Sequence, residues 1–214
     1  MHIPDAFIPI WQGAIYGIIA LVFVALALRW AKNEMNEEKL PLVAVLAAGI
    51  FALQSFNLPV SMGTSGHLVG GALAAIILGS PFAAIFILTM VLIVQAVLFG
   101  DGGITTLGAN IINMGVIGGF VGFYSFKGIM GMTRSMPISV FFAAWLACVI
   151  PALACAVEMY LAGTFPLTEG LIAMGIYHAI IGVIEGIVTV AAIYLITTAR
   201  PDLVDTGVKA VPGA

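Results

Sequence analysis

The chain has 214 residues, of which 62% are hydrophobic and only 8% are charged, and its mean hydropathy is +1.19. Water-soluble domains carry about 25% charged residues, so this composition excludes a soluble domain and indicates a membrane protein. Seven Lys and Arg against ten Asp and Glu give a formal net charge of -3. So few cations cannot neutralise a nucleic-acid backbone, which excludes nucleic acid as a partner.

The sequence shows neither a secretory signal nor a disulfide pattern. The opening Met1-His2-Ile3-Pro4-Asp5 has no basic region ahead of an apolar stretch, so we expect no cleavable signal and a mature chain that begins at Met1. Cys148 and Cys155 are seven residues apart in one apolar run, which places them about two turns apart on one helix face. That separation is too long for a disulfide.

Apolar stretches close to the roughly 20 residues that cross a bilayer recur along the chain. They are Trp11 to Trp30, Pro41 to Phe56, His67 to Leu78, Phe82 to Phe99, Ile104 to Tyr124, Pro137 to Leu161 and Leu171 to Thr197. The third is short and ends at Gly79-Ser80-Pro81, so we expect a half-buried or tilted helix there. The sequence predicts an all-α polytopic bundle of about seven transmembrane helices, in a single membrane domain over residues 1–214.

The cations predict the orientation of this bundle, because cytoplasmic loops carry excess Lys and Arg. With alternating spans, every cation falls on one side: Arg29, Lys32, Lys39, Lys127, Arg134, Arg200 and Lys209. We therefore expect Met1 outside and residues 198–214 as a cytoplasmic tail. No internal repeat is evident, which argues against an inverted-repeat carrier.

His2, one of three histidines, stands beside the terminal amine of Met1. The amine, the His2 backbone nitrogen and the His2 ring Nδ1 can close a five-membered and a six-membered ring around a metal. Loss of the backbone proton favours metals late in the Irving–Williams order, such as Ni²⁺ or Cu²⁺, with Co²⁺ still open. Pro4 restricts Ile3 and stiffens the peptide after the chelate. The alternative is that His2 is a frayed terminal residue without function.

His67 is the natural fourth ligand, since it lies on the same expected side as Met1. It follows Thr64-Ser65-Gly66. Glycine permits close backbone approach, and the two hydroxyl groups can supply hydrogen bonds around the metal-binding ring. The alternative is that Gly66 and Gly70 form a small-xxx-small pattern that serves helix packing alone.

The opening Met1-His2-Ile3-Pro4-Asp5 and the segment Gly63-Thr64-Ser65-Gly66-His67-Leu68 carry a resemblance. Together they resemble the nickel/cobalt substrate-binding membrane component of energy-coupling-factor transporters, the CbiM/NikM family. The resemblance extends over nearly the whole chain in length, span count and orientation. The family often has glycine after the acidic residue, whereas Ala6 follows Asp5 here.

The resemblance implies that the N-terminus folds back into the bundle and supplies ligands. It implies Met1 and His2 as ligands and His67 as the fourth, with Ni²⁺ or Co²⁺ as the transported substrate. The metal-binding N-terminal segment is then residues 1–10 and the metal-site loop residues 57–67. No organic cofactor is implied.

Polar residues inside apolar spans are costly in hydrocarbon and suggest function by default. They are Gln54, Gln95, Asn110, Asn113, Glu158, His178 and Glu185. Asn110 and Asn113 share a helix face, from which they can line the metal path or bond the N-terminal segment. His178 and Glu185 also share a face and can hold each other through water or bond neighbouring helices separately. The alternative for all of them is interhelical hydrogen bonding, worth about 0.6 kcal/mol per pair.

The chain lacks a phosphate-cradling loop, since no lysine stands between the required glycines and a Ser or Thr. ATP-driven transport would therefore need separate subunits. The resemblance implies a transmembrane coupling subunit and two cytoplasmic ATPases, and leaves open a small accessory membrane subunit. Ala44, Ala48 and Ala52 recur at every fourth residue, a pattern that suits close approach of a partner helix or internal packing.

Two other functions compete with a metal-binding transport subunit. A secondary carrier would use Glu158, Glu185 and His178 to exchange protons for metal, and its uptake would follow the proton gradient without ATP. An intramembrane metal-dependent hydrolase is disfavoured, because no His-Glu-x-x-His motif or evident general base is present. We therefore expect a transport subunit without enzymatic activity, and nickel and cobalt both fit its site.

Overall fold

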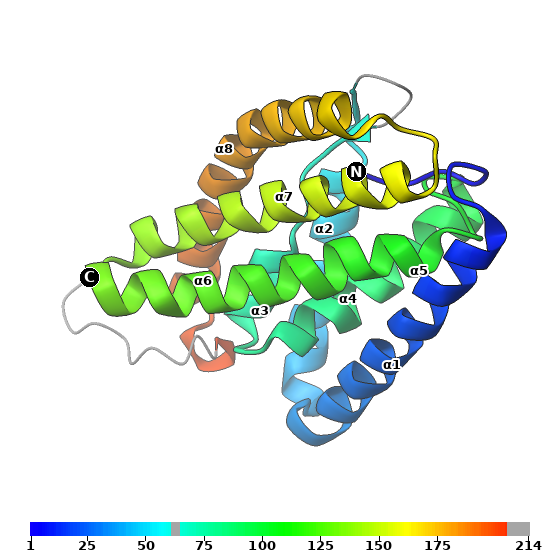
Figure 1. Cartoon of the computed structure of the whole chain (residues 1–214). Helices are drawn as coiled ribbons and strands as arrows, with labels where there is room; N and C mark the ends of the chain where they lie inside the picture. The colour runs from blue at the N-terminus through cyan, green and yellow to red at the C-terminus, as the bar shows by residue number, and fades with distance from the viewer. Residues whose placement is uncertain (61–64, 205–214) are drawn as a thin grey trace.

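A computed structural model describes residues 1–60 and 65–204. Over these residues the chain forms one bundle of eight α-helices, of which α5 and α6 belong to one continuous helical segment, so that there are seven segments, with a single pair of two-residue strands (Figure 1). Five of the helices are long and apolar enough to cross a membrane. The predicted all-α membrane bundle of about seven helices is confirmed at this level.

The helices are α1 (Ile10–Glu34), α2 (Leu40–Gln54), α3 (Gly71–Ile77), α4 (Pro81–Val94), α5 (Leu107–Asn110), α6 (Gly118–Thr133), α7 (Met136–Leu161) and α8 (Leu167–Ala199). The π-helical segment Gln95–Phe99 continues α4, and a second, Ile111–Ile117, joins α5 to α6. Short 3₁₀ turns occur at Glu37–Lys39 and Pro201–Leu203. The strands β1 (Leu58–Pro59) and β2 (Ser65–Gly66) pair antiparallel.

The stretch from His67 to Leu78 differs most from its prediction. Its helix, α3, begins only at Gly71, and all seven of its residues are buried. Seven helical residues span about 10 Å, a third of the hydrocarbon core. Gly70 precedes the helix in the left-handed region, at φ 78°, which leaves residues 67–70 as a non-helical loop. The expected half-buried helix is thus a short, fully buried helix inside the bundle.

Small residues bring the helices around α3 close together. A side chain at Gly122 of α6 would meet the Ala72 Cα at 2.7 Å, and one at Gly119 would meet the Ala84 Cβ at 2.7 Å. Helices in a bilayer associate through such close packing, because lipid gives no hydrophobic force between them. α3 therefore forms the centre against which α4, α6, α7 and α8 pack.

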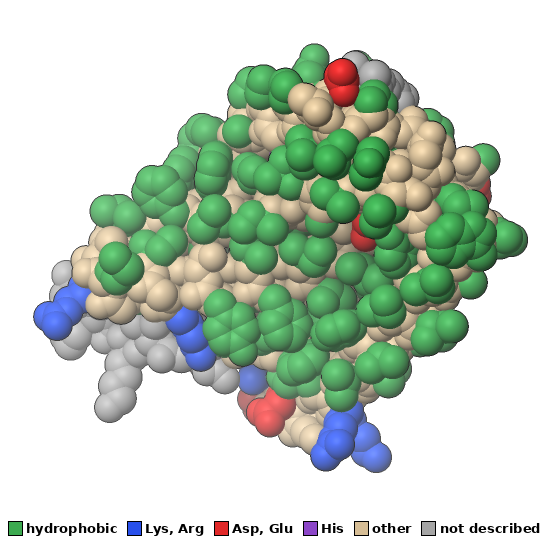
Figure 2. All heavy atoms as spheres, viewed as in Figure 1, with side chains coloured by type: hydrophobic (Ala, Val, Ile, Leu, Met, Phe, Trp, Pro, Cys, Tyr) green, Lys and Arg blue, Asp and Glu red, His purple; other side chains and the backbone are tan. Residues whose placement is uncertain are grey.

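The outer surface suits a bilayer. Hydrophobic side chains cover most of the face in Figure 2, and the Lys and Arg side chains visible there lie along its lower edge. The N-terminus lies toward the opposite, upper end of the bundle in Figure 1. This separation agrees with the charge asymmetry expected from the sequence.

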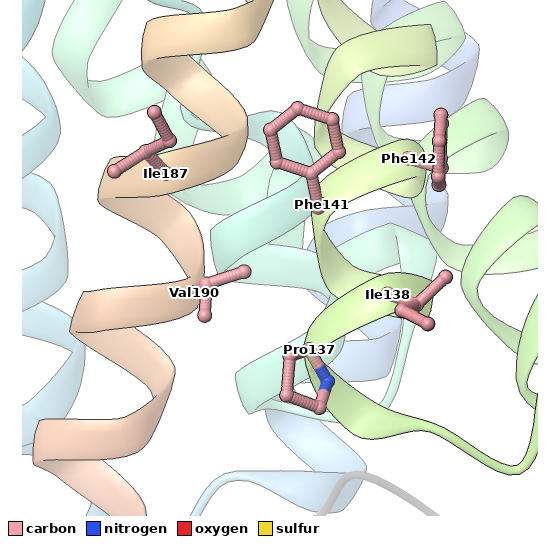
Figure 3. Close-up of a pocket in the computed structure, with 6 residues that line it drawn as sticks. All are labelled: Pro137, Ile138, Phe141, Phe142, Ile187 and Val190. Carbon is pink, nitrogen blue, oxygen red and sulfur yellow. The ribbon is translucent and has the colours of Figure 1, made fainter.

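A groove lies between α7 and α8. Its lining is wholly apolar: Pro137, Ile138, Phe141, Phe142, Ile187 and Val190 (Figure 3). The N-terminal residues contact α7 at Cys155, whose Sγ lies 3.7 Å from the Met1 carbonyl oxygen. Phe142 precedes Cys155 by thirteen residues, which is about 20 Å along the helix. The groove has no metal-ligating side chain and is separate from the site described below.

Candidate metal centre

The first three residues lie inside the bundle. Met1 and Ile3 are fully buried, and His2 is 3% exposed. A frayed terminus would be exposed to solvent, so the reading of His2 as a frayed residue is wrong. The buried N-terminus brings the Met1 amine to Ser65, whose carbonyl oxygen accepts its hydrogen bond and whose Oγ lies 3.4 Å away.

Main-chain bonds to Ile3 fix the segment beyond the first two residues. The Ile3 carbonyl oxygen accepts bonds from Thr106 Oγ1 at 2.6 Å, Gly103 N at 3.1 Å and Asn110 Nδ2 at 3.1 Å. The Ile3 N–H donates to Asn110 Oδ1 at 2.8 Å. Both backbone polar groups of this buried residue are thus satisfied by residues 100 or more positions away.

Asp5 closes this segment against the start of α5. Its Oδ1 accepts from the Thr105 N–H at 2.8 Å and from Thr105 Oγ1 at 2.5 Å, and its Oδ2 accepts from Ile104 N at 3.2 Å. These bonds, with the Thr105 hydroxyl first, lower the pKa of Asp5. Ala6 then turns the chain at φ 70°, a conformation that glycine adopts freely. The residue at which this chain departs from the family pattern is therefore a strained one.

The rings of His2 and His67 stack, with centroids 4.3 Å apart and planes at 28°. His67 Nδ1 donates to the Leu68 carbonyl at 2.8 Å, so its Nε2 carries the lone pair. His2 Nε2 donates to Gln95 Oε1 at 3.1 Å, which leaves the lone pair on Nδ1. Both remaining ring nitrogens are buried without a hydrogen-bond partner. His2 Nδ1 is the ring nitrogen that the sequence assigns to a metal, and His67 Nε2 belongs to the residue predicted as the fourth ligand.

Burial keeps these groups neutral near pH 7. It lowers the pKa of the Met1 amine to about 6 and that of His2 to about 4, with the adjacent amine adding to the effect on His2. Burial, and then the same amine, also hold the pKa of His67 well below its usual range. Metal binding requires deprotonated ligands, so the three groups are ready to bind near neutral pH.

Asp101 is the acidic side chain beside this cluster. Its Oδ1 lies 3.4 Å from His2 Nδ1, without the geometry of a hydrogen bond. A turn of glycines makes the approach possible: a Cβ on Gly102 would lie 3.2 Å from His2 Cδ2, and one on Gly103 would lie 2.5 Å from Asp5 N. Asp101 thus places a negative charge where a cation would arrive.

The other predicted site residues fall in different places. Asn113 Nδ2 donates to Glu158 Oε2 at 2.6 Å, away from the N-terminal segment. His178 Nδ1 bonds the Met174 carbonyl of its own helix at 2.8 Å, and its Nε2 has no hydrogen-bond partner. Glu185 bonds the backbone of Val69 and Gly70. These contacts match neither proposed arrangement fully: the two residues bond separately, but His178 bonds its own helix and Glu185 bonds the loop before α3 rather than a neighbouring helix.

The expected 57–67 loop and the three alanines of α2 are described in part and in full, respectively. Thr64 lies outside the described residues, as do residues 61–64 of the expected 57–67 loop and residues 205–214 of the expected tail. Ser65 contacts the Met1 amine. The alanines at 44, 48 and 52 are exposed along one face of α2, so they do not serve internal packing.

Asp101 and Thr106 are site residues that the sequence did not predict. Gln95 was predicted only as a polar residue in an apolar span, without a role at the metal site. It begins a π-helical segment, a feature common at functional sites. Thr106 carries no such signal. Within the part of the chain that the structure describes, no group of three or more His, Cys, Asp or Glu is arranged to hold a metal.

Comparison with known proteins identifies the family. A family described as the cobalt uptake substrate-specific transmembrane region matches residues 2–203. The chain belongs to the CbiM family. It is a substrate-specific transmembrane component of cobalt or nickel uptake, a non-catalytic membrane component.

Individual members of the CbiM family and solved structures agree over the whole chain. A protein named as a fused nickel transport protein, NikMN, of Archaeoglobus fulgidus is 38% identical over all of this chain and 70% of its own length. The cobalt transport protein CbiM of Geobacter sulfurreducens is 33% identical over 95% of this chain and 61% of its own length. The crystal structure of a truncated transition metal transporter matches with a TM-score of 0.88 and 30% identity, over 93% of this chain and 99% of that chain.

Proposed function

We propose that this chain binds one Ni²⁺ or Co²⁺ ion through four nitrogens and delivers it for import. The ligands are the Met1 amine, the His2 backbone nitrogen, His2 Nδ1 and His67 Nε2. The observation that carries the proposal is the pair of buried, unbonded ring nitrogens on two rings whose centroids are 4.3 Å apart. Metal–nitrogen bonds of about 2 Å require two such rings to lie side by side.

The donor set favours a square-planar ion. Three nitrogens from Met1 and His2 are nearly coplanar, because they close two fused chelate rings. A fourth from His67 completes a plane of nitrogens, which is diagnostic of Ni²⁺ or Cu²⁺ among the divalent ions. The relatives include proteins named for nickel transport and others named for cobalt transport, so elemental analysis of the purified protein decides which ion this chain carries.

The deciding experiment alters the terminal amine. The chelate requires a mature chain that begins at Met1, since one added residue turns the amine into a peptide nitrogen. A chain with one extra residue before Met1 should lose Ni²⁺ and Co²⁺ binding as completely as His67→Ala does, and a C-terminal tag should leave binding unchanged. Native affinity in the extended chain would overturn the proposal and direct attention to Glu158 and Glu185.

We also propose that Met1 faces outward and residues 198–214 face the cytoplasm. The support is the one-sided placement of the cations, since excess Lys and Arg remain inside. The metal then enters from outside, where Asp101 and the N-terminal segment lie. In this orientation residues 1–10 are the metal-binding segment and residues 57–67 are the loop that presents His67.

The partners we propose are a transmembrane coupling subunit and two cytoplasmic ATPases, because the chain has no phosphate-binding loop of its own. An accessory membrane subunit fits the fused relatives named NikMN and CbiMQ. The exposed alanines of α2 give the coupling subunit a smooth face. Ala48→Leu should weaken co-purification of the partner and leave metal bound. Loss of metal with the complex intact would instead assign this face to the fold.

A further inference from the structure

Glu185, near the middle of α8, is bonded to the backbone that follows His67. Its Oε2 accepts from Val69 N at 2.9 Å and its Oε1 accepts from Gly70 N at 2.8 Å. The residue is 2% exposed, so the carboxylate is shielded from both lipid and water. A carboxylate that accepts one backbone N–H on each oxygen holds that backbone at a defined distance from its own helix.

A second helix holds the same loop from the other side. Gln54, at the end of α2, donates from Nε2 to the Val69 carbonyl at 2.7 Å and is fully buried. Gly70 packs against Ile50 of α2 so closely that a Cβ there would lie 2.7 Å from Ile50 Cγ1. The loop of residues 67–70 therefore lies between α2 and α8, with a buried polar side chain from each helix on its main chain.

The His67 ring depends on this loop for its direction. Its bonded nitrogen, Nδ1, reaches only the carbonyl of the next residue, Leu68. Because Nδ1 is bonded to the main chain of the same loop, the orientation of the His67 ring follows the conformation of that loop. Besides its stacking on His2, the position of Nε2 therefore depends on the bonds of Val69 and Gly70, two and three residues further along the chain.

We propose that Glu185 is a positioning residue for the metal ligand His67. This inference rests on the proposed function, in which His67 Nε2 supplies the fourth nitrogen. Glu185 does not touch the metal: it holds the loop so that Nε2 meets the plane of the other three nitrogens. Ligand placement of this kind must be accurate to about 0.5 Å, and loss of a group that orients a ligand typically costs 10- to 100-fold in affinity.

Three substitutions distinguish a positioning role for Glu185 from a general contribution of buried carboxylates to the stability of the fold. Glu185→Gln preserves size but replaces one acceptor with an NH₂ group that faces a backbone N–H, so one of the two bonds is lost. Glu185→Asp keeps both acceptors on a shorter side chain. Glu158→Gln is the matched control, since Glu158 is also a buried carboxylate of a long helix but bonds Asn113 rather than the loop.

The experiment measures Ni²⁺ affinity and the absorption band of bound Ni²⁺ in the purified full chain, with and without free imidazole. We expect Glu185→Gln to bind Ni²⁺ about 10- to 100-fold more weakly and to shift the band toward that of His67→Ala. Free imidazole should restore the band in both variants, because it replaces a displaced ring. Glu185→Asp should recover part of the affinity, and Glu158→Gln should keep the native band.

A native band and native affinity in Glu185→Gln would overturn the inference. So would weaker binding with an unshifted band, since that result shows that His67 still occupies its place among the four nitrogens and that the loss has another cause. If Glu185→Gln gives no folded protein, Gln54→Leu tests the same loop from α2 with the same outcomes. The chain with one extra residue before Met1 separates the two proposals: native binding there overturns the four-nitrogen site itself, whereas loss there with a native Glu185→Gln overturns only the positioning role.

Discussion

Asn110 pairs with the backbone of Ile3 in both directions. Its Oδ1 accepts the Ile3 N–H at 2.8 Å, and its Nδ2 donates to the Ile3 carbonyl at 3.1 Å. The side-chain amide of Asn110, which projects from a helix, thus makes the same donor and acceptor pair of bonds that a neighbouring β-strand would make to Ile3. Because Ile3 follows His2 directly, this pairing fixes the peptide next to the one whose nitrogen is proposed to bind the metal.

We predict that Asn110→Leu lowers Ni²⁺ affinity by about 10- to 100-fold, the range seen when a group that orients a ligand is removed. The substitution keeps the branched shape and the number of heavy atoms of the side chain but leaves the Ile3 N–H without its partner in a buried site. Competition with a chelator of known affinity measures the loss.

Gln12→Leu is the control for Asn110→Leu. Gln12 is also a buried amide, 4% exposed, but its Nε2 donates to Tyr16 Oη and the Glu158 carbonyl rather than to the backbone of Ile3. It should leave affinity unchanged. Equal losses in both variants would show that Asn110 supports only the fold.

The helices could be predicted from the sequence because a bilayer leaves the backbone few choices. Each span must satisfy its own hydrogen bonds within hydrocarbon, so a long apolar run is a helix. The same argument failed at His67 to Leu78. There the apolar residues are buried by protein rather than lipid, and hydropathy does not distinguish these two environments.

The site could be predicted only in part, because residues far apart in the sequence form it. His2 and His67 were identifiable because histidines are rare here and one of them adjoins the terminal amine. Asn110 and Glu185 also stood out as polar residues in apolar spans, and bonding the N-terminal segment was one of the two roles predicted for Asn110. The individual backbone groups that these two side chains bond could not be predicted. Glu185 bonds Val69 across 116 positions and Asn110 bonds Ile3 across 107, and such pairings follow from tertiary packing rather than from any local pattern.

We predict that Ala6→Gly stabilises the docked N-terminal segment. Ala6 has φ 70°, a conformation that costs an L-residue roughly 1–2 kcal/mol and costs glycine almost nothing. The greater freedom of glycine in the undocked chain offsets about 0.5–1 kcal/mol of this. The net gain should raise the Tm of the protein, and metal affinity by up to about fivefold if docking limits binding.

Ala14→Gly is the control for Ala6→Gly. Ala14 lies within α1, where glycine should destabilise the helix by about 0.5–1 kcal/mol. The two substitutions should therefore shift the Tm in opposite directions. A lower Tm for Ala6→Gly would show that the turn at residue 6 is not strained.

We predict that a cysteine at Asn57 reacts with a membrane-impermeant maleimide in intact cells, and that a cysteine at Asn33 reacts only after permeabilisation. Both positions are exposed, and Asn33 stands beside the Lys32 of the charged side. The natural thiols of Cys148 and Cys155 are fully buried and should give little background. The reverse labelling pattern would contradict the proposed orientation.

The lowered pKa values predict how many protons leave when metal binds. Burial lowers the pKa of the Met1 amine to about 6 and that of His2 to about 4, so at about pH 7 both groups have already lost their protons. The His2 amide keeps its proton at that pH and must release it to ligate. We therefore expect about one proton per Ni²⁺ near pH 7, and protons should compete with the metal through the amine only below about pH 6.

Calorimetry in two buffers of different ionisation enthalpy counts these protons. Near pH 5 the amine is mostly protonated and His2 mostly neutral, so the count should rise to about two per Ni²⁺. An amine with its reference pKa of about 8 would already give nearly two near pH 7, which would show that Met1 is not buried before the metal arrives. A count near zero at about pH 7 would exclude the His2 amide as a ligand, because no other route frees its lone pair for the metal.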